Sequence, residues 1–268
     1  MIHLLGGKFA AAIEAARILR EMGVEFSVIP SSGEERIPAM PSLERFAVEH
    51  EIPIVRDLAG LHGEDITFLS VEFDRLIHPA RFGGASRFFN IHFSLLPAYR
   101  GTMTSFWPIV LRERTTGVTL HRIDDGIDTG DIIARRSFAI GEEDTCRDLY
   151  FRYHEAAAAL LRDHLESVID GSFTARPQGN EGAGSFPRFL YPFFPKEFTS
   201  RQLRLMERGD VHNILRGLIF REYQLPLVDG ERIARIALAD FPERNRTVPT
   251  NGGELYALAA GDQPDEAR

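Results

Sequence analysis

Residues 2–30, IHLLGGKFAAAIEAARILREMGVEFSVIP, join two short apolar segments through a helical pattern. That pattern places apolar side chains on one helix face, at Phe9, Ile13, Ala16 and Leu19. Gly23 follows as a helix stop signal, and residues 26–29 form the second apolar segment. A strand, a helix and a second strand in this order indicate a parallel α/β sheet.

The next part of the chain continues this alternation of helices and strands. Further strands are expected at 52–55, 66–71, 117–123 and 132–136. Further helices are expected at 43–50 and, behind the capping residues Thr145 and Asp148, at 145–170. In such sheets ligands bind outside the carboxyl ends of the strands. Functional residues are therefore expected in the loops that follow each strand.

The remaining residues have a different pattern. Residues 211–220 have the spacing of an amphipathic helix, and Asp229-Gly230 between two apolar runs is a strong hairpin signal. We therefore expect a main domain at 1–195, a small helix and β-hairpin unit at 196–240, and a polar, disordered tail at 241–268.

The composition excludes several classes of protein. The 268 residues carry 31 basic and 39 acidic side chains, a net charge of −8, so no nucleic acid partner is expected. No apolar run reaches the roughly 20 residues that cross a bilayer, and the first residues lack a signal-peptide pattern. We expect a cytoplasmic protein with no membrane partner. The single cysteine, Cys146, excludes an internal disulfide and a four-thiolate metal site.

Common nucleotide and metal motifs do not occur in the sequence. Gly6-Gly7 does not fit G-x-G-x-x-G, and no acidic residue ends the second apolar segment, which argues against NAD. Neither a G-x-x-x-x-G-K-[ST] phosphate loop nor an H-E-x-x-H helix is found. The acidic stretch 124–131 lacks the order of a calcium loop, so no metal is expected.

Asn90 and His92 end the apolar segment before SLLPAYRG, residues 94–101. The two residues are two positions apart, so in a strand their side chains leave the same face. An amide N–H beside an imidazole suits acyl transfer, in which one group stabilises an oxyanion and the other holds or moves a proton.

A second stretch, GVTLHRIDDGIDTGD at residues 117–131, contains several carboxylates. Asp128 follows an apolar residue and precedes Thr129-Gly130, so it is expected to point inward, whereas the other acids are interpreted as a solvated turn. His121 lies on the preceding strand and is expected to be a core or supporting histidine.

Together the two stretches resemble the signature of the 10-formyltetrahydrofolate-dependent formyltransferases. That signature has the form Asn-x-His, Ser-Leu-Leu-Pro-x-Tyr-Arg/Lys-Gly and Gly-Val-Thr-x-His-x-x-Asp-x-x-x-Asp-Thr-Gly-Asp, and each element occurs between Asn90 and Asp131. The resemblance implies an α/β fold with a Rossmann-like open parallel sheet for the catalytic domain. It also implies a catalytic trio of Asn90, His92 and Asp128.

The resemblance further implies where ligands bind. The co-substrate 10-formyltetrahydrofolate is expected at Val71, Phe73, Arg75, Leu76, Ile77, Asp125 and Ile127. The acceptor substrate is expected at Tyr99, Arg100, Thr104 and Tyr223. An arginine at such a position can grip a diphosphate, and a phenol can stack or form a hydrogen bond.

Four shorter segments resemble the branch of the family that formylates amino sugars on nucleotide carriers: FNIHFS at 89–94, TSFWPI at 104–109, RDLY at 147–150 and FREYQLP at 220–226. The resemblance therefore implies a nucleotide-linked amino sugar as substrate, such as dTDP-4-amino-4,6-dideoxyglucose or its 3-amino isomer.

Other functions share the same motifs. Methionyl-tRNA formyltransferase is disfavoured because the segment after Lys196 is too short for the β-barrel domain of those enzymes, and because the chain is acidic. Glycinamide ribonucleotide formyltransferase is disfavoured because such enzymes usually end near the first domain, whereas this chain continues. A formyltetrahydrofolate hydrolase would use water in place of an amine. A binding module without activity is disfavoured because the trio is intact. A homodimer is expected, because a helix and one hairpin scarcely bury a stable core.

Overall fold

The computed structural model describes residues 1–37, 40–243 and 245–262. The chain forms two compact units, and each contains segments that are separate in the sequence. The first unit comprises 1–101, 117–138 and 152–185; the second comprises 102–116, 139–151 and the chain from 186 onward. The chain passes between the two units several times before Lys196. The domain boundary expected near Lys196 stays a prediction.

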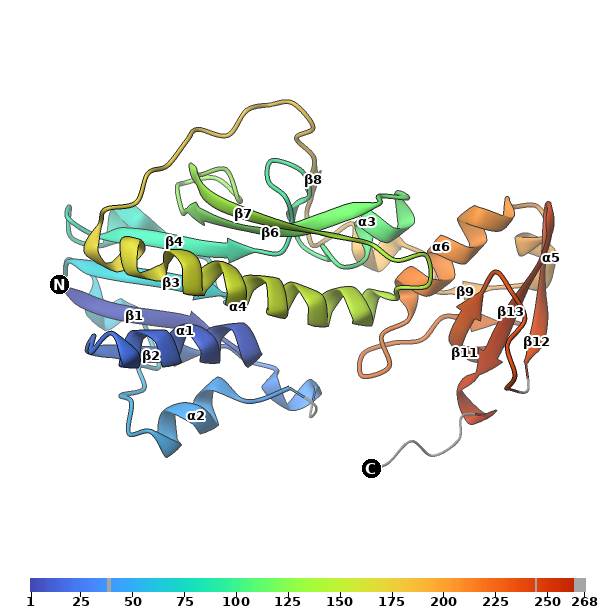
Figure 1. Ribbon diagram of the computed structural model, residues 1–268, viewed down its shortest axis with the longest axis horizontal. Helices are drawn as coiled ribbons and strands as arrows, with labels where there is room; N and C mark the ends of the chain where they lie inside the picture. Colours follow the sequence, from blue (N-terminus) through green and yellow to red (C-terminus); the bar gives the residue numbers. More distant parts are fainter. Residues whose placement is uncertain (38–39, 244, 263–268) are drawn as a thin grey trace. The chain divides into compact units, whose positions relative to one another are not determined.

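A six-stranded sheet forms the centre of the first unit, in the order β2-β1-β3-β4-β6-β7. The strands are β1 (Ile2–Gly7), β2 (Phe26–Pro30), β3 (Ile66–Val71), β4 (Arg87–His92), β6 (Thr115–Arg122) and β7 (Ile132–Ala139). β1 pairs in parallel with β2 and β3, β3 pairs in parallel with β4, and β6 runs antiparallel to β4. The expected α/β fold with an open, largely parallel sheet is confirmed (Figure 1).

The helices of this sheet agree with the sequence periodicity. They are α1 (Phe9–Glu21), α2 (Leu43–Glu49) and α4 (Cys146–Asp170), with short 3-10 turns at η1 (Glu34–Arg36), η2 (Ala59–Leu61) and η3 (Pro79–Arg81). Within the first unit, α1 lies beside α4, since Arg162 Nε donates to Glu14 Oε1 at 2.8 Å. β5 (Arg100–Gly101) and β8 (Ser185–Phe186) form a separate two-stranded sheet.

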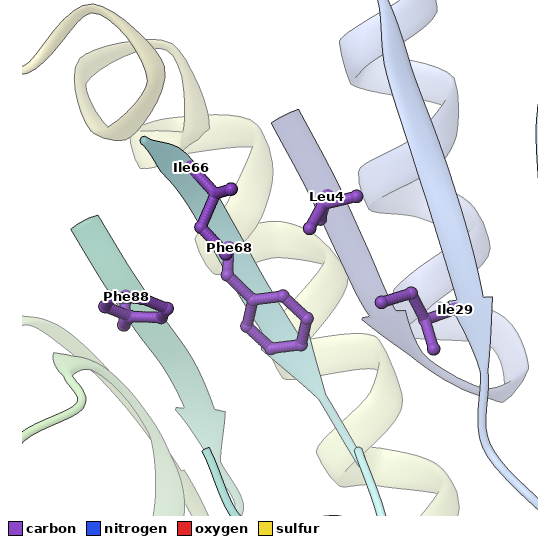
Figure 2. Packing of buried hydrophobic residues seen from close by; sticks show 5 residues of the cluster. All are labelled: Leu4, Ile29, Ile66, Phe68 and Phe88. Carbon is purple, nitrogen blue, oxygen red and sulfur yellow. The ribbon is translucent and has the colours of Figure 1, made fainter. Parts of the chain in front are cut away.

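One face of the parallel strands carries a tight apolar cluster (Figure 2). Its buried members come from four neighbouring strands: Leu4, Ile29, Ile66, Phe68 and Phe88. Partly buried side chains from the segments that connect α2 to β3, β3 to β4, and β6 to β7 pack against the cluster, among them Phe73, Ile77 and Ile123. The loops that follow β3 and β6 are thus held by the core.

Gly6 and Gly7, which read as a turn in the sequence, are the last residues of β1. A Cβ atom on Gly7 would lie 2.0 Å from the carbonyl oxygen of Val71, and one on Gly6 would lie 2.4 Å from the ring of Phe68. The glycines therefore permit the close approach of β1 to β3, where the two strands end together.

The second unit has a five-stranded sheet in the order β12-β13-β11-β10-β9. Its strands are β9 (Glu197–Phe198), β10 (Leu227–Val228), β11 (Glu231–Ala237), β12 (Arg246–Thr250) and β13 (Gly253–Ala259). Its helices are α3 (Trp107–Val110), α5 (Ser200–Leu203) and α6 (Arg208–Leu218), with η4 (Tyr191–Phe193) and η5 (Ala260–Asp262). The predicted hairpin is present, because β10 and β11 pair antiparallel across Asp229 and Gly230, both with positive φ.

The polar tail expected at 241–268 is corrected over much of its length. β12 and β13 form a second hairpin there, and Val248 and Leu255 are fully buried. The apolar positions are too sparse to stand out in the sequence, and the turn at Asn251-Gly252 that joins the strands was not recognised. Residues 263–268 of that tail lie outside the described residues.

No helix within the described ranges is both long enough and apolar enough to cross a membrane.

Candidate active site

Asn90 and His92 occupy the last positions of β4, as predicted, and face the antiparallel strand β6. In this register Asn90 pairs with His121 and His92 pairs with Thr119. Antiparallel pairing places opposite side chains within reach of one another. The strand that interrupts the parallel sheet thus brings a second histidine to the site.

His121 orients the amide of Asn90. Its Nδ1 lies 2.8 Å from the carbonyl oxygen of Arg122, which can only accept, so Nδ1 carries the proton. Nε2 is then an acceptor, and Asn90 Nδ2 donates to it at 3.1 Å. Burial, and next the nearby His92, lower the pKa of His121 to about 4, so this ring is neutral near pH 7. One N–H of Asn90 is therefore held, and the direction of the other is fixed by the same bond.

His92 is fixed by a backbone group. Its Nε2–H donates to the carbonyl oxygen of Tyr99 at 2.8 Å, and the ring is only 7% exposed. Nδ1 lies 3.6 Å from Asp128 Oδ2. This distance is longer than a hydrogen bond, so a proton on Nδ1 lies near the carboxylate without being hydrogen-bonded to it.

Asp128 is placed by an unusual backbone conformation. Its φ is +54°, in the left-handed region that residues with a Cβ rarely adopt. The carboxylate points to β4: Oδ2 accepts from the Gly101 N–H at 2.8 Å, and Oδ1 lies 3.7 Å from His121 Nε2. The prediction that Asp128 is the inward-pointing acid of this loop agrees with these contacts.

The loop that carries Asp128 is braced from within. Asp124 Oδ1 accepts from Thr129 Oγ1 at 2.6 Å and from the Gly126 N–H at 3.1 Å. A Cβ on Gly130 would lie 1.9 Å from the Arg122 carbonyl oxygen, so only glycine fits where the loop returns to β6. Asp124 is exposed, as expected for a solvated turn, and its hydrogen bonds to Gly126 and Thr129 give it a structural role that was not expected.

The segment that presents the Tyr99 carbonyl is braced as well. Thr119 Oγ1 donates to the Ser94 carbonyl oxygen at 2.7 Å and accepts from the Leu96 N–H at 3.1 Å. Ser94 Oγ donates to the Ala98 carbonyl oxygen at 2.7 Å. These bonds give the turn a defined shape, which fixes the direction of the Tyr99 carbonyl.

Arg100, predicted to bind substrate, is held by a residue that the sequence did not reveal. Arg100 Nε and Nη2 donate to Gln178 Oε1 at 3.2 and 2.8 Å. Gln178 lies in the loop after α4 and belongs to no recognisable motif. Only the folded chain shows that it reaches the site.

The expected folate residues lie on two loops of the first unit. Val71 is buried at the end of β3, and Phe73 and Ile77 pack against the apolar cluster. The Arg75 guanidinium lies 4.7 Å from the centre of the Phe73 ring. Asp125 is exposed, and Leu76 and Ile127 are unusually exposed for apolar residues, at 71% and 52%.

Thr104 and Tyr223, the other expected substrate residues, belong to the second unit. Thr104 is half-buried. Tyr223 is 45% exposed, and its ring meets Phe220 edge-on at 4.8 Å. A role of these two residues beside the trio stays a prediction.

Within the described part of the chain, no group of three or more His, Cys, Asp or Glu side chains has an arrangement that could hold a metal ion.

Two of the known structures that match over almost the whole chain have sequence identities near 30%. WlaRD, a sugar 3N-formyl transferase crystallised in the presence of dTDP and 5-N-formyl-THF, is 31% identical with a TM-score of 0.85, covering 98% of this chain and 99% of that chain. An N-formyltransferase from Helicobacter canadensis, in complex with folinic acid and dTDP-3-aminofucose, is 29% identical with a TM-score of 0.84, covering 97% and 100%.

Curated relatives match over a shorter length. The methionyl-tRNA formyltransferase of Corynebacterium urealyticum is 30% identical over 184 residues, which is 65% of this chain and 56% of that protein. That of Sorangium cellulosum is 34% identical over 178 residues, 64% of this chain and 55% of that protein. This chain spans about half the length of these relatives.

The family described as formyl transferase matches residues 68–165, a range that includes β4, the braced turn and the Asp128 loop. The match covers all three residues of the expected trio, and the likeness to the sugar formyltransferases extends over nearly the full length. The chain belongs to the formyl transferase family.

Proposed function

We propose that this protein is an N-formyltransferase that moves the formyl group of 10-formyltetrahydrofolate to the primary amine of a nucleotide-linked amino-dideoxy sugar. The observation that carries the proposal is the convergence of the Asn90 amide, the His92 ring and the Asp128 carboxylate at the end of β4. The full-length likeness to two sugar formyltransferases supports the substrate class.

The amide of Asn90 has the features of an oxyanion donor. When an amine attacks a formyl carbon, negative charge develops on the formyl oxygen, and a pre-oriented N–H stabilises that charge. The bond to the neutral His121 ring fixes one N–H of Asn90 and thereby the direction of the other. No reorganisation of the amide is then needed during the reaction.

His92 and Asp128 have the features of a proton-holding pair. With Nε2–H bonded to the Tyr99 carbonyl, the ring can gain or lose a proton only at Nδ1, which faces Asp128. The 3.6 Å separation between Nδ1 and the carboxylate leaves the Nδ1–H available to the formyl oxygen. Asp128 can also relay, through water, the proton that the attacking amine releases.

Two exposed apolar residues support a folate site beside the trio. Leu76 follows β3, and Ile127 immediately precedes Asp128, so both lie in loops at the edge of the sheet that carries the trio. The folate supplies the formyl group, and the apolar side chains of these loops would cover its ring system. Phe73 and Ile77 would support this surface from the core side.

The two structural relatives favour an amine at ring position 3 and a dTDP carrier. One is a sugar 3N-formyl transferase crystallised with dTDP, and the other was solved with dTDP-3-aminofucose. We propose the same class of acceptor here, with the 4-amino isomer as the alternative. Arg100, and in the second unit Thr104 and Tyr223, are the residues proposed to bind it.

A turnover screen tests this function. The purified full chain is incubated with 10-formyltetrahydrofolate and a panel of amino-sugar nucleotides that differ in ring position and carrier. Initiator methionyl-tRNA and a water-only reaction complete the panel. Formylation of a dTDP-amino sugar, identified by mass spectrometry, is the expected result. Turnover only with tRNA, or formate release without an acceptor, would contradict it.

Methionyl-tRNA formylation is the second candidate, since the curated relatives carry that name. The net charge of −8 argues against a tRNA partner, because such binding depends on neutralising phosphates. The tRNA arm of the screen separates the two candidates directly.

The cytoplasmic location and the homodimer stay predictions. Sedimentation of the purified chain at micromolar concentration tests the dimer, and a single monomeric species would contradict it.

A further inference from the structure

Gln178 makes hydrogen bonds with every polar group of its side chain. Nε2 donates to the carbonyl oxygens of Asp128 at 2.9 Å and of Gly130 at 2.7 Å. Oε1 accepts from Arg100 Nε at 3.2 Å and from Nη2 at 2.8 Å. Both N–H bonds and both lone pairs of the amide are therefore used, and the reverse orientation would set N–H groups against a guanidinium. The amide can occupy this site in one orientation only.

The donor side of Gln178 holds the loop that presents the acid. Asp128 has a positive φ, a conformation that persists only when its surroundings enforce it. Asp124 braces the loop from within, and Gln178 fixes the two carbonyl groups on either side of Thr129. Loss of the Nε2 donors would leave these carbonyl groups without this partner and relax the backbone that aims the carboxylate.

The acceptor side of Gln178 sets the direction of the Arg100 fork. Nε and one Nη2 proton bond to the amide oxygen along one edge of the guanidinium. The other edge, formed by Nη1 and the outer Nη2 proton, has the geometry that binds two oxygens of a phosphate. Because Gln178 occupies the first edge, the second edge is the one left for an anion.

We propose that Gln178 is a positioning residue that couples the two halves of the site, holding Asp128 for proton handling and Arg100 for the diphosphate of the nucleotide sugar. This assignment rests on the proposed function for the identity of the anion. The coupling itself rests on the four hydrogen bonds. Substitution of Gln178 should accordingly affect both kcat and KM, whereas loss of Arg100 should affect mainly KM.

Four variants of the full chain separate the effect of Gln178 on Asp128 from its effect on Arg100. They are Gln178→Met, Arg100→Ala, the double variant and Asn180→Ala. Methionine keeps the shape of the glutamine side chain and removes its polar groups. Asn180 is an exposed neighbour whose carbonyl accepts the only bond described for it, so its side chain serves as the matched control. Gln178→Asn, one methylene shorter, is added in case the Met variant folds poorly.

Steady-state kinetics with the acceptor found in the screen provide the first readout. Gln178→Met should lower kcat about ten- to a hundredfold, the range expected when a reacting group is misplaced. It should also raise KM for the nucleotide sugar about tenfold, as expected for loss of an oriented charged donor. Arg100→Ala should raise KM similarly with kcat within about threefold. In the double variant KM should rise no further, because Gln178 acts on KM through Arg100.

Amide hydrogen exchange provides a readout that needs no turnover. The Gly101 N–H donates to Asp128 Oδ2, so its exchange rate reports whether the carboxylate is held. Gln178→Met should accelerate exchange at Gly101, whereas Arg100→Ala and Asn180→Ala should leave it unchanged. Binding of inorganic diphosphate, measured by calorimetry, should weaken in both the Gln178 and the Arg100 variants.

The two proposals fail in different ways. A wild-type chain that formylates no amino sugar would overturn the proposed function, while Gly101 exchange and diphosphate binding would still test the role of Gln178. Normal kcat and normal Gly101 exchange in Gln178→Met would overturn the positioning role, as would additive KM effects in the double variant.

Discussion

Two acids of the first unit, Asp128 and Glu72, each lie close to a buried histidine of another segment, and the two pairs differ in what surrounds them. His92 Nδ1 lies 3.6 Å from Asp128, and His154 Nε2 lies 3.4 Å from Glu72. Both histidine side chains are less than a tenth exposed, and both acids follow a strand and have a positive φ. By distance, burial and backbone strain alone, the pairs are equivalent.

Their other contacts distinguish them. His154 Nδ1 accepts from the Ala11 N–H in the first turn of α1 at 3.4 Å, and the rings of Phe9 and Phe93 meet it edge-on. This pair therefore joins α4 to the start of α1 and is a packing element of the core. A strained acid beside a buried histidine is thus insufficient to identify an active site.

At the other pair, polar groups converge instead. Asp128 lies within 4 Å of two imidazoles, and the Asn90 amide bonds to one of them. The histidine is fixed by a carbonyl group, and the ring that meets it edge-on is the imidazole of His121. At this pair, the second N–H of Asn90 lies near a histidine that can hold a proton at Nδ1. The contacts described for the His154 pair include no such side-chain amide.

Asp128→Asn should have the largest effect on activity. The amide can still accept from the Gly101 N–H but can no longer take up the proton that the attacking amine releases, so kcat should fall about a hundred- to ten-thousandfold. Asp131→Asn is the matched control. Activity near that of the control would remove Asp128 from the mechanism.

Asn90→Ala should follow, with kcat reduced about a hundred- to a thousandfold, the usual loss when one oxyanion donor is removed. KM for the folate should change little, since the donor acts mainly on the developing charge. Kinetics at saturating folate, with circular dichroism to verify folding, provide the measurement. An increase in KM alone would show that Asn90 only binds the ground state.

His121→Gln should have a smaller effect on kcat, about tenfold, because the glutamine oxygen can still accept from Asn90. The variant should also change acid stability. The pKa of His121 is lowered to about 4 from 6.5, so its neutral form stabilises the fold fully above about pH 6.5, and this contribution is lost as the pH falls toward 4. Denaturant unfolding at pH 7 and pH 5 should show a weaker pH dependence in the variant; an unchanged difference would refute this account.

His154→Phe tests the other pair and should have the smallest catalytic effect. The aromatic packing is kept, but the Ala11 N–H loses its acceptor, so the free energy of unfolding should fall by about 1–3 kcal/mol. At a temperature where the protein stays folded, kcat should match that of His164→Phe, a half-buried control on the same helix. A loss of kcat comparable to that of Asp128→Asn would make the two pairs functionally alike.

Much of the sheet, and the proximity of the three residues of the proposed trio, could be predicted from the sequence, because both depend on local patterns. The strand and helix periods up to Asp170 are strong, and the spacing of Asn90, His92 and Asp128 is contained in two motifs. The β12 and β13 hairpin was missed because its apolar positions are few and its turn is only weakly marked.

Contacts between distant segments could not be predicted. Gln178 reaches the loop of Asp128 from a position 50 residues away, and its loop has no periodicity that would indicate its direction. The contact of the Tyr99 carbonyl could not be predicted for another reason. Every residue has a backbone carbonyl group, so the residue type at position 99 does not indicate this contact. Sequence reasoning assigned Tyr99 through its phenol, whereas the contact with His92 is made by its main chain.

That main-chain contact has a consequence for how such an enzyme can diversify. Since the carbonyl at position 99 is present whatever amino acid stands there, His92 keeps its tautomer under any replacement that preserves the turn. On the proposed function, evolution can therefore alter the side chain at position 99, and with it the range of accepted sugars, while the contact that orients His92 is kept.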